Sequence, residues 1–253
     1  MTNNRTVDSM EYCHLDFKSK NYDDGYDLPY RVYYPSSYKR TKKAFPLLFF
    51  LHGYGECGTE NEKQIRVLTK ENRLLDMIVE RDDCIIVAPQ CPADPAKYNW
   101  VPINKVWSTG SRELSEFPTV TFEAAAELLF SFVNSGRVDK SRVYLGGISM
   151  GGYAAWEMLT RYPDVFAAAV PVCGSGIPSK ADRLVNIPIW AFHGLEDGTV
   201  PPKGTKDMEN AIKEAGGTKM KATYFEGVGH NVWPNAYATP GLVDWLMSQK
   251  KQQ

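Results

Sequence analysis

The segment RVYLGGISMGGYAAWEM, residues 142–158, constrains the fold of this chain more than any other. A strand-like apolar run leads into four glycines that surround Ser149, and a helix-like run follows. Glycines at this place let the backbone turn sharply from a strand into a helix, and such a turn presents the side chain at its apex. The alternative is an ordinary glycine-rich turn in which the serine has no role.

Short runs rich in β-branched and aromatic residues alternate with longer runs of helical period, which predicts an α/β fold with a mostly parallel sheet and helices on both faces. Eight strands are expected, at residues 14–20, 28–35, 45–52, 84–90, 142–148, 167–173, 187–193 and 221–227. Five helices are expected, at residues 63–79, 121–135, 151–162, 205–216 and 240–251. We therefore expect a single domain over residues 1–253.

Residues 91–118 form a stretch of 28 residues with four prolines and two tryptophans. This stretch is too long for a routine loop between a strand and a helix and too aromatic for a disordered linker. We expect an ordered excursion over the edge of the active site.

The chain has 29 Lys and Arg against 30 Asp and Glu. This balance does not indicate a charged surface that binds nucleic acid or an anionic membrane. The longest apolar stretch, FPLLFFL, is far shorter than a membrane-spanning helix requires, and the N-terminal residues lack the apolar region of a signal peptide. We expect a cytoplasmic protein, although a chain trimmed of an export signal would look the same. The sequence carries no indication of the oligomeric state.

Five cysteines at irregular spacing, with no CxxC pair, suggest free thiols rather than a zinc site or a redox dithiol. Cys57 and Cys91 each follow an expected strand, and these two strands can be neighbours in the sheet. A disulfide between Cys57 and Cys91 is therefore an open alternative.

The segment HGYGECG, with Gly53, Gly55 and Gly58, has the GxGxxG spacing of a dinucleotide-binding turn. Such a turn needs an acidic residue at the end of the next strand, and here that strand ends in Gln90. These glycines can instead bring backbone N–H groups to a developing negative charge.

A serine nucleophile needs a general base and a carboxylate that orients the base, and in this type of fold the acid precedes the histidine in the chain. Asp197 lies just beyond the strand at 187–193, and His230 lies beyond the strand at 221–227. The order Ser149, Asp197, His230 is the required one. Taken singly, Asp197 can be a turn residue, its neighbour Glu196 can be the acid, and His230 can be a surface histidine.

The other histidines fit a structural role better. His52 and His193 each precede a glycine at a strand end and are expected to support loop geometry by hydrogen bonding, and His14 lies in the N-terminal hairpin. No HExxH pattern or cluster of ligand residues suggests a metal. The expected chemistry requires no cofactor.

At HGYGECG, GGISMGGYAAWE, HGLEDGTVP and GVGHNVW the chain resembles the α/β-hydrolase superfamily. Within it, the chain is similar to bacterial carboxylesterases of the phospholipase/carboxylesterase and predicted-peptidase group, related to polyhydroxybutyrate depolymerases and feruloyl esterases. The resemblance runs from about residue 28 to 247. It implies Ser149 as nucleophile, His230 as general base and Asp197 as the orienting acid.

The resemblance also implies an oxyanion hole made by the backbone N–H groups of Tyr54 and Met150. Only about a dozen residues separate VPVCGSG from IPIWAFH, where many relatives insert a lid, so no large lid domain is expected.

We expect a serine carboxylesterase for short-chain or aromatic, feruloyl-type esters, with a small ester as its partner; an ester linked to a plant polysaccharide is one such substrate. Trp100, Trp107 and Trp233 are candidates for lining the pocket, and their alternative is a place in the core. Two other functions use the same fold: a serine peptidase and a binding protein without catalysis.

Overall fold

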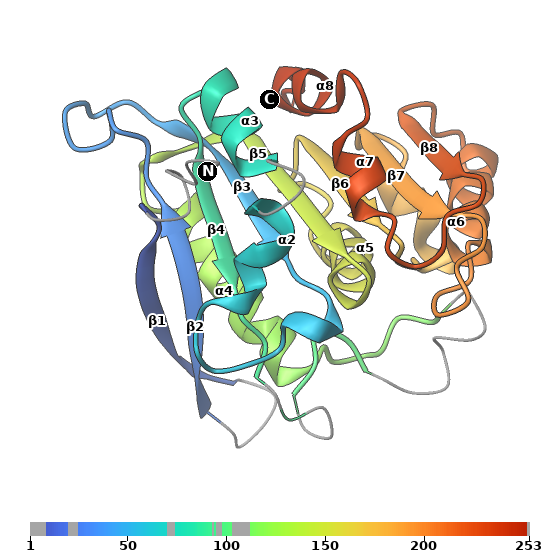
Figure 1. Ribbon diagram of the computed structural model, residues 1–253, viewed down its shortest axis with the longest axis horizontal. Helices are drawn as coiled ribbons and strands as arrows, with labels where there is room; N and C mark the ends of the chain where they lie inside the picture. The colour runs from blue at the N-terminus through green and yellow to red at the C-terminus, as the bar shows by residue number, and fades with distance from the viewer. Residues whose placement is uncertain are drawn as a thin grey trace.

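The protein is described by a computed structural model that covers residues 9–19, 25–69, 74–92, 94, 98–102 and 112–251. One eight-stranded sheet runs through the molecule in the order β1-β2-β4-β3-β5-β6-β7-β8 (Figure 1). Strand β2 pairs antiparallel with β1 and with β4, and all the other neighbours are parallel. The predicted class, an α/β fold with a mostly parallel sheet, is confirmed.

The strands span residues Glu11–Lys18 (β1), Gly25–Tyr33 (β2), Phe45–Leu51 (β3), Ile85–Pro89 (β4), Val138–Ile148 (β5), Ala168–Val172 (β6), Ile189–Gly194 (β7) and Met220–Phe225 (β8). The α-helices span Arg66–Thr69 (α2), Leu74–Arg81 (α3), Val120–Val133 (α4), Met150–Arg161 (α5), Lys203–Glu214 (α6), Trp233–Tyr237 (α7) and Leu242–Ser248 (α8). Short 3₁₀ helices are Tyr54–Glu56 (η1), Lys63–Ile65 (η2) and Pro178–Leu184 (η4). Within the described residues, every helix is too short or too polar to cross a bilayer.

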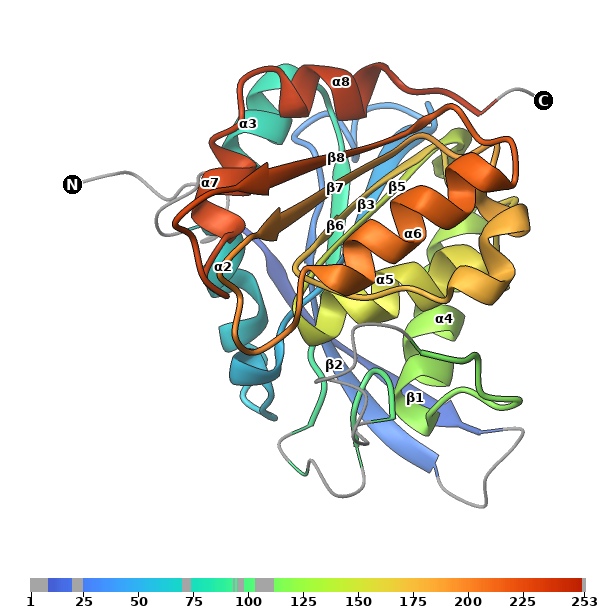
Figure 2. The ribbon, with the colours of Figure 1, turned by 90° about the vertical axis from the view of Figure 1, so that its right-hand side faces the viewer.

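The helices cover both faces of the sheet. Helices α4, α5 and α6 lie on one face, and α2, α3, α7 and α8 lie on the other (Figure 2). Because the crossing helices shield both faces, parallel strands consist of nearly continuous apolar residues.

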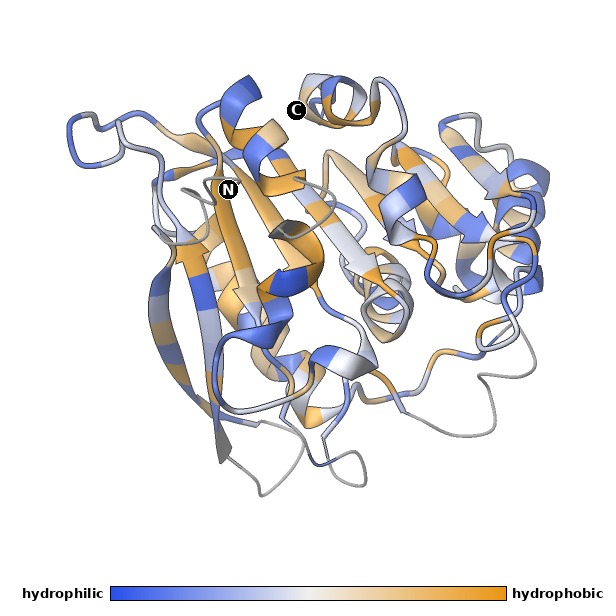
Figure 3. Ribbon diagram, in the orientation of Figure 1, coloured by the Kyte–Doolittle hydropathy of each residue, from blue (hydrophilic) through white to orange (hydrophobic). Residues whose placement is uncertain are grey.

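Strand β3 shows how the sequence builds this core. All seven of its residues are buried, and alternate side chains enter opposite layers: Leu47 and Phe49 pack with α4 and α5, and Leu48 and Phe50 pack with α2 and α3. Figure 3 shows the apolar colouring concentrated along the central strands. Burying each such side chain contributes about 1.5–3 kcal/mol, so this strand is a major source of stability.

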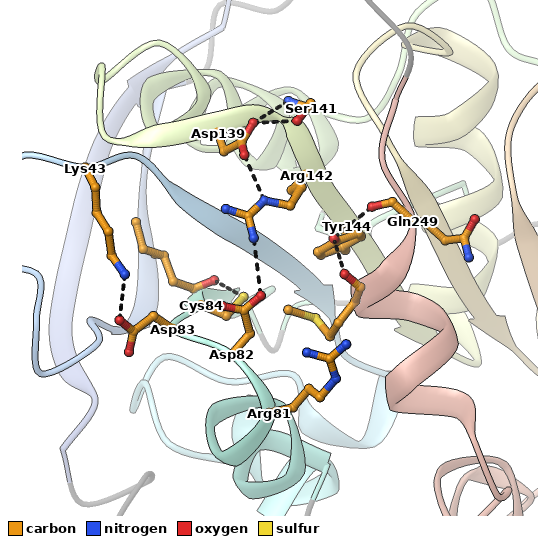
Figure 4. Close-up of polar contacts among 12 residues, drawn as sticks. Lys43, Arg81, Asp82, Asp83, Cys84, Asp139, Ser141, Arg142, Tyr144 and Gln249 are labelled. Carbon is orange, nitrogen blue, oxygen red and sulfur yellow. Dashed lines mark hydrogen bonds and ion pairs between the residues drawn. The ribbon is translucent and has the colours of Figure 1, made fainter.

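A polar network secures the end of the sheet where β5 begins (Figure 4). Arg142 contacts Asp139 at 2.8 Å and Asp82 at 3.2 Å. The Tyr144 hydroxyl lies 3.1 and 2.9 Å from two backbone carbonyls at the C-terminal end of α8. These contacts fix β5, the strand that leads to Ser149, to the segment after α3 and to the last helix.

The sequence predicted all eight strands, but it did not predict η4 or α7. The first of the five predicted helices is wrong in part. The expected helix at 63–79 begins as η2 and α2, and α3 follows at Leu74–Arg81. Helix α7 has only five residues with a proline in its first turn, which is too short for a helical period to be visible.

Candidate active site

Ser149 lies at the sharp turn from β5 into α5. Its backbone has φ 51° and ψ −118°, a left-handed conformation that is strained for a residue with a side chain. The Ser149 N–H donates to the Val172 carbonyl at 2.9 Å, which holds the turn against the end of β6. This conformation is the one expected for a nucleophile presented at a strand-to-helix elbow.

Glycines on both sides of Ser149 allow the turn to close. A Cβ atom at Gly147 would lie 2.2 Å from the Gly151 carbonyl oxygen, and one at Gly151 would lie 2.0 Å from the Leu51 carbonyl oxygen. Backbone atoms this close cannot move aside cheaply. The glycines that the sequence placed around the serine are therefore required by close backbone approach.

Replacement of Gly151 by alanine should destabilise the protein by about 3 kcal/mol, because the new methyl group would overlap the backbone of β3. Thermal unfolding should show a fall in Tm of roughly 10 °C. Gly55→Ala is the matched control, because a Cβ at Gly55 meets nothing within 4 Å. Equal stability of the two variants would contradict the packing argument.

The structure brings Ser149, His230 and Asp197 together in one hydrogen-bonded chain. The Ser149 hydroxyl lies 2.9 Å from His230 Nε2, and His230 Nδ1 lies 2.8 Å from Asp197 Oδ2. The His230 side chain is 24% exposed, whereas the Asp197 side chain is fully buried. The imidazole thus faces the serine on one side and a shielded carboxylate on the other.

Asp197 is held as an ionised carboxylate. Burial alone would raise its pKa, but hydrogen bonds from His193 and His230 and from the Val200 N–H lower the pKa well below its usual range. Asp197 Oδ1 accepts the backbone N–H groups of Thr199 at 2.9 Å and Val200 at 2.8 Å. A carboxylate in this state can favour the tautomer of His230 whose proton is on Nδ1.

The sequence did not predict the contact between His193 and Asp197. The His193 Nε2 atom lies 3.3 Å from Asp197 Oδ2, and its ring also contacts Thr205 and the Val200 carbonyl. The only sequence signal is a histidine at the end of β7, four residues before the acid. Glu196, the alternative acid, is exposed to solvent.

The two backbone N–H groups expected for an oxyanion hole come from segments that pack against each other. Met150 is the first residue of α5, where backbone N–H groups have no partner within the helix. Tyr54 begins η1, and two residues separate it from the end of β3. A Cβ at Gly151 would lie 2.5 Å from the His52 carbonyl oxygen, so the segment that precedes Tyr54 adjoins the first turn of α5.

His52 and Trp100 hold the segment before Tyr54 in place through hydrogen bonds. The His52 Nε2 atom accepts the Cys91 N–H at 2.8 Å, so its Nδ1 carries the proton and donates to the Gly53 carbonyl at 2.6 Å. The Trp100 Nε1–H donates to the His52 carbonyl at 3.2 Å. Trp100 has no exposed surface, so of its two alternatives, lining the pocket or a place in the core, the structure supports the core.

Of the other two candidate tryptophans, one lies beside His230 and the other is not described by the structure. Trp233 is half-buried, and its ring meets that of His230 edge to face with the centroids 5.9 Å apart. Trp107 lies outside the described residues. The Trp233 ring therefore lies next to His230, and the Tyr54 side chain is exposed.

We predict that the stability of the folded state depends on pH through His52. Burial lowers the pKa of His52 to about 4, against about 6.5 in an unfolded chain. Between these values the unfolded state binds a proton that the folded state does not, so stability falls as the pH decreases through this window, by about 3 kcal/mol. Measurement of Tm from pH 7 to 4 should show this slope, and His52→Gln should flatten it. An unchanged slope in His52→Gln, or an equal flattening in the surface variant His14→Gln, would contradict the assignment.

One group of possible metal ligands exists among the described residues, and it overlaps the hydrogen-bonded chain. The ligand atoms of Cys173, Asp197 and His230 lie within 4.8 Å of one another. Burial raises the pKa of the Cys173 thiol far above its usual value, so this group offers a neutral thiol, which is a poor metal ligand. Asp197 and His230 already bind each other, and the set fits a proton relay better than a metal site.

Known proteins that are similar to this chain include an esterase and a depolymerase. Residues 35–238 match the family described as Phospholipase/Carboxylesterase. Esterase YjfP of Escherichia coli (strain K12) is 22% identical over 249 residues, which cover 83% of this chain and 91% of that protein. Poly(3-hydroxyalkanoate) depolymerase C of Paucimonas lemoignei is 26% identical over 138 residues, which cover 41% of this chain and 33% of that protein.

Solved structures show the same fold. A thermostable esterase has a TM-score of 0.79 at 29% identity, and the match covers 98% of this chain and 64% of that one. A ferulic acid esterase has a TM-score of 0.64 at 18% identity and covers 94% of this chain and 98% of that one. The chain spans less than two thirds of the thermostable esterase and of the depolymerase. The expected class, a carboxylic ester hydrolase, is confirmed at the level of the family: the chain belongs to the phospholipase/carboxylesterase family of α/β-hydrolases.

Proposed function

We propose that this protein is a serine carboxylesterase in which Ser149 is the nucleophile, His230 the general base and Asp197 the group that orients the base. The observation that carries this proposal is the hydrogen-bonded chain from Ser149 through His230 to Asp197, which starts at a strained elbow. A free serine hydroxyl is a poor nucleophile, and a histidine held by a buried carboxylate supplies the activation.

The reaction proceeds through an acyl-enzyme. His230 takes the proton of Ser149 as the oxygen attacks the ester carbonyl, and the N–H groups of Tyr54 and Met150 stabilise the oxyanion. His230 then gives the proton to the departing alcohol, and in the second half of the reaction it activates a water that releases the acid. Asp197 stabilises the imidazolium in both halves.

The substrate class is short-chain or aromatic, feruloyl-type esters. Between β6 and β7 the chain holds only η4, Pro178–Leu184, and a segment this short does not form a broad apolar cover for long acyl chains. The rings of Tyr54 and Trp233 offer apolar contact to a small acyl or aromatic group. The ferulic acid esterase of the same fold is consistent with this class.

Initial rates on p-nitrophenyl acetate, butyrate, octanoate and palmitate and on methyl ferulate test the proposal, with Ser149→Ala as the blank. We expect turnover of the short esters, of the ferulate or of both, and none above the blank for palmitate. Palmitate as the best substrate would overturn the substrate class. Turnover of peptide p-nitroanilides in place of every ester would instead assign the same residues to a serine peptidase.

A further inference from the structure

Two thiols, those of Cys57 and Cys91, adjoin the segment that carries Tyr54. Cys57 is the C-cap of η1, and its N–H donates to the Tyr54 carbonyl at 3.2 Å. Cys91 lies just beyond β4, and its N–H donates to the His52 ring. Both are free thiols in this structure, with Cys57 partly exposed and Cys91 buried.

The two cysteines are held side by side by the backbone. The Gly58 N–H donates to the Cys91 carbonyl at 2.9 Å, and the Gln90 side chain donates to the Glu56 carbonyl at 3.0 Å. These bonds join the residues on both sides of Cys57 to the end of β4. The Cys91 side chain therefore lies next to the Cys57 side chain, close enough for each thiol to shift the pKa of the other.

The pair is asymmetric in the way that a reactive dithiol requires. The interaction with the Cys91 side chain lowers the pKa of the Cys57 thiol, and burial raises the pKa of Cys91 well above its usual value. The partly exposed thiol therefore forms the attacking thiolate more readily, and the buried thiol lies within reach of its sulfur.

We propose that Cys57 and Cys91 form a site of thiol modification that reacts with small-molecule disulfides and closes to an intramolecular disulfide. The Cys57 thiolate attacks one sulfur of the reagent, forms a mixed disulfide and releases one thiolate. The Cys91 sulfur then attacks the Cys57 sulfur, and its proton passes to the second thiolate as that group departs. Two electrons pass from the two cysteines to the reagent, which leaves as two thiols.

The disulfide should alter the oxyanion segment, and this consequence rests on the proposed function. Disulfide sulfurs are about 2.05 Å apart, closer than two free thiols can approach, so the bond draws the two sulfurs together. Cys57 is bonded to the Tyr54 carbonyl, so this shift displaces η1 and the Tyr54 N–H. A displacement of about 1 Å at a group that stabilises the transition state can lower the rate by one to two orders of magnitude.

The experiment treats the reduced protein with glutathione disulfide and then measures intact mass, Tm and the kinetics of p-nitrophenyl acetate hydrolysis. We expect a mass loss of about 2 Da, a Tm higher by roughly 5 °C or more, and a kcat at least about tenfold lower. Dithiothreitol should reverse all three changes. Peptide mapping should locate the bond between Cys57 and Cys91.

Two variants test whether the changes in mass, Tm and kcat depend on Cys57. Cys57→Ser should lose all three responses, whereas Cys13→Ser, which removes another partly exposed thiol, should retain them. Failure to form the Cys57–Cys91 bond, or formation of the bond with kcat unchanged, would overturn the inference. If the reduced protein hydrolysed no ester, the proposed function would fail instead, and mass and Tm would still decide whether the thiols react.

Discussion

Replacement of Ser149 by alanine should lower kcat/KM for p-nitrophenyl esters by about four to six orders of magnitude. The variant keeps His230 and Asp197 but has no atom that can form the acyl-enzyme. The fold should be retained, because the hydrogen bond to His230 is the one contact described for the Ser149 hydroxyl. Steady-state kinetics together with circular dichroism and Tm measure both parts.

The matched control is Ser131→Ala, which removes a hydroxyl from an exposed position on α4. Its kinetics should equal those of the wild type within about twofold. A loss of less than tenfold in Ser149→Ala would mean that the ester is cleaved elsewhere or by another mechanism.

Replacement of Asp197 by asparagine should lower kcat by about 10⁴-fold with little change in KM. An asparagine amide can donate a hydrogen bond to His230 Nδ1, which favours the tautomer with the proton on Nε2. His230 in that tautomer cannot accept the Ser149 proton. The effect should be present across the neutral pH range, because the pKa of Asp197 lies well below its usual range.

The neighbouring acid provides the control for this prediction. Glu196→Gln removes the same charge one residue away from an exposed side chain, and its kcat should change by less than about threefold. If Glu196→Gln lost more activity than Asp197→Asn, the acid would have been assigned to the wrong residue.

The sheet could be predicted from the sequence because its strands carry a strong pattern. Phe45–Leu51 is apolar throughout, which a strand covered on both faces requires. The candidate residues could be predicted for a related reason. Parallel strands place their carboxyl ends at one edge of the sheet, so the residues that follow β5, β7 and β8 meet there.

The parts that could not be predicted lack a repeating pattern. Trp100 lies in a stretch without helical or strand period, so nothing in the sequence shows that its ring is buried beneath His52. The contact between His193 and Asp197 depends on how the loop after β7 turns back, which the residue types do not determine. A disulfide between Cys57 and Cys91 stayed an open alternative, because the spacing of two cysteines in the sequence does not give the distance between their thiols; the structure has both as free thiols.

The most direct test of the central claim is detection of the acyl-enzyme. The protein is mixed with excess p-nitrophenyl acetate, quenched with acid within the first turnovers and digested, and the peptides are analysed by mass spectrometry. We predict a burst of p-nitrophenolate and an acetyl group on Ser149, both absent from Ser149→Ala. Ester hydrolysis with no acetylated Ser149 under these conditions, or with the acetyl group on another residue, would contradict the account.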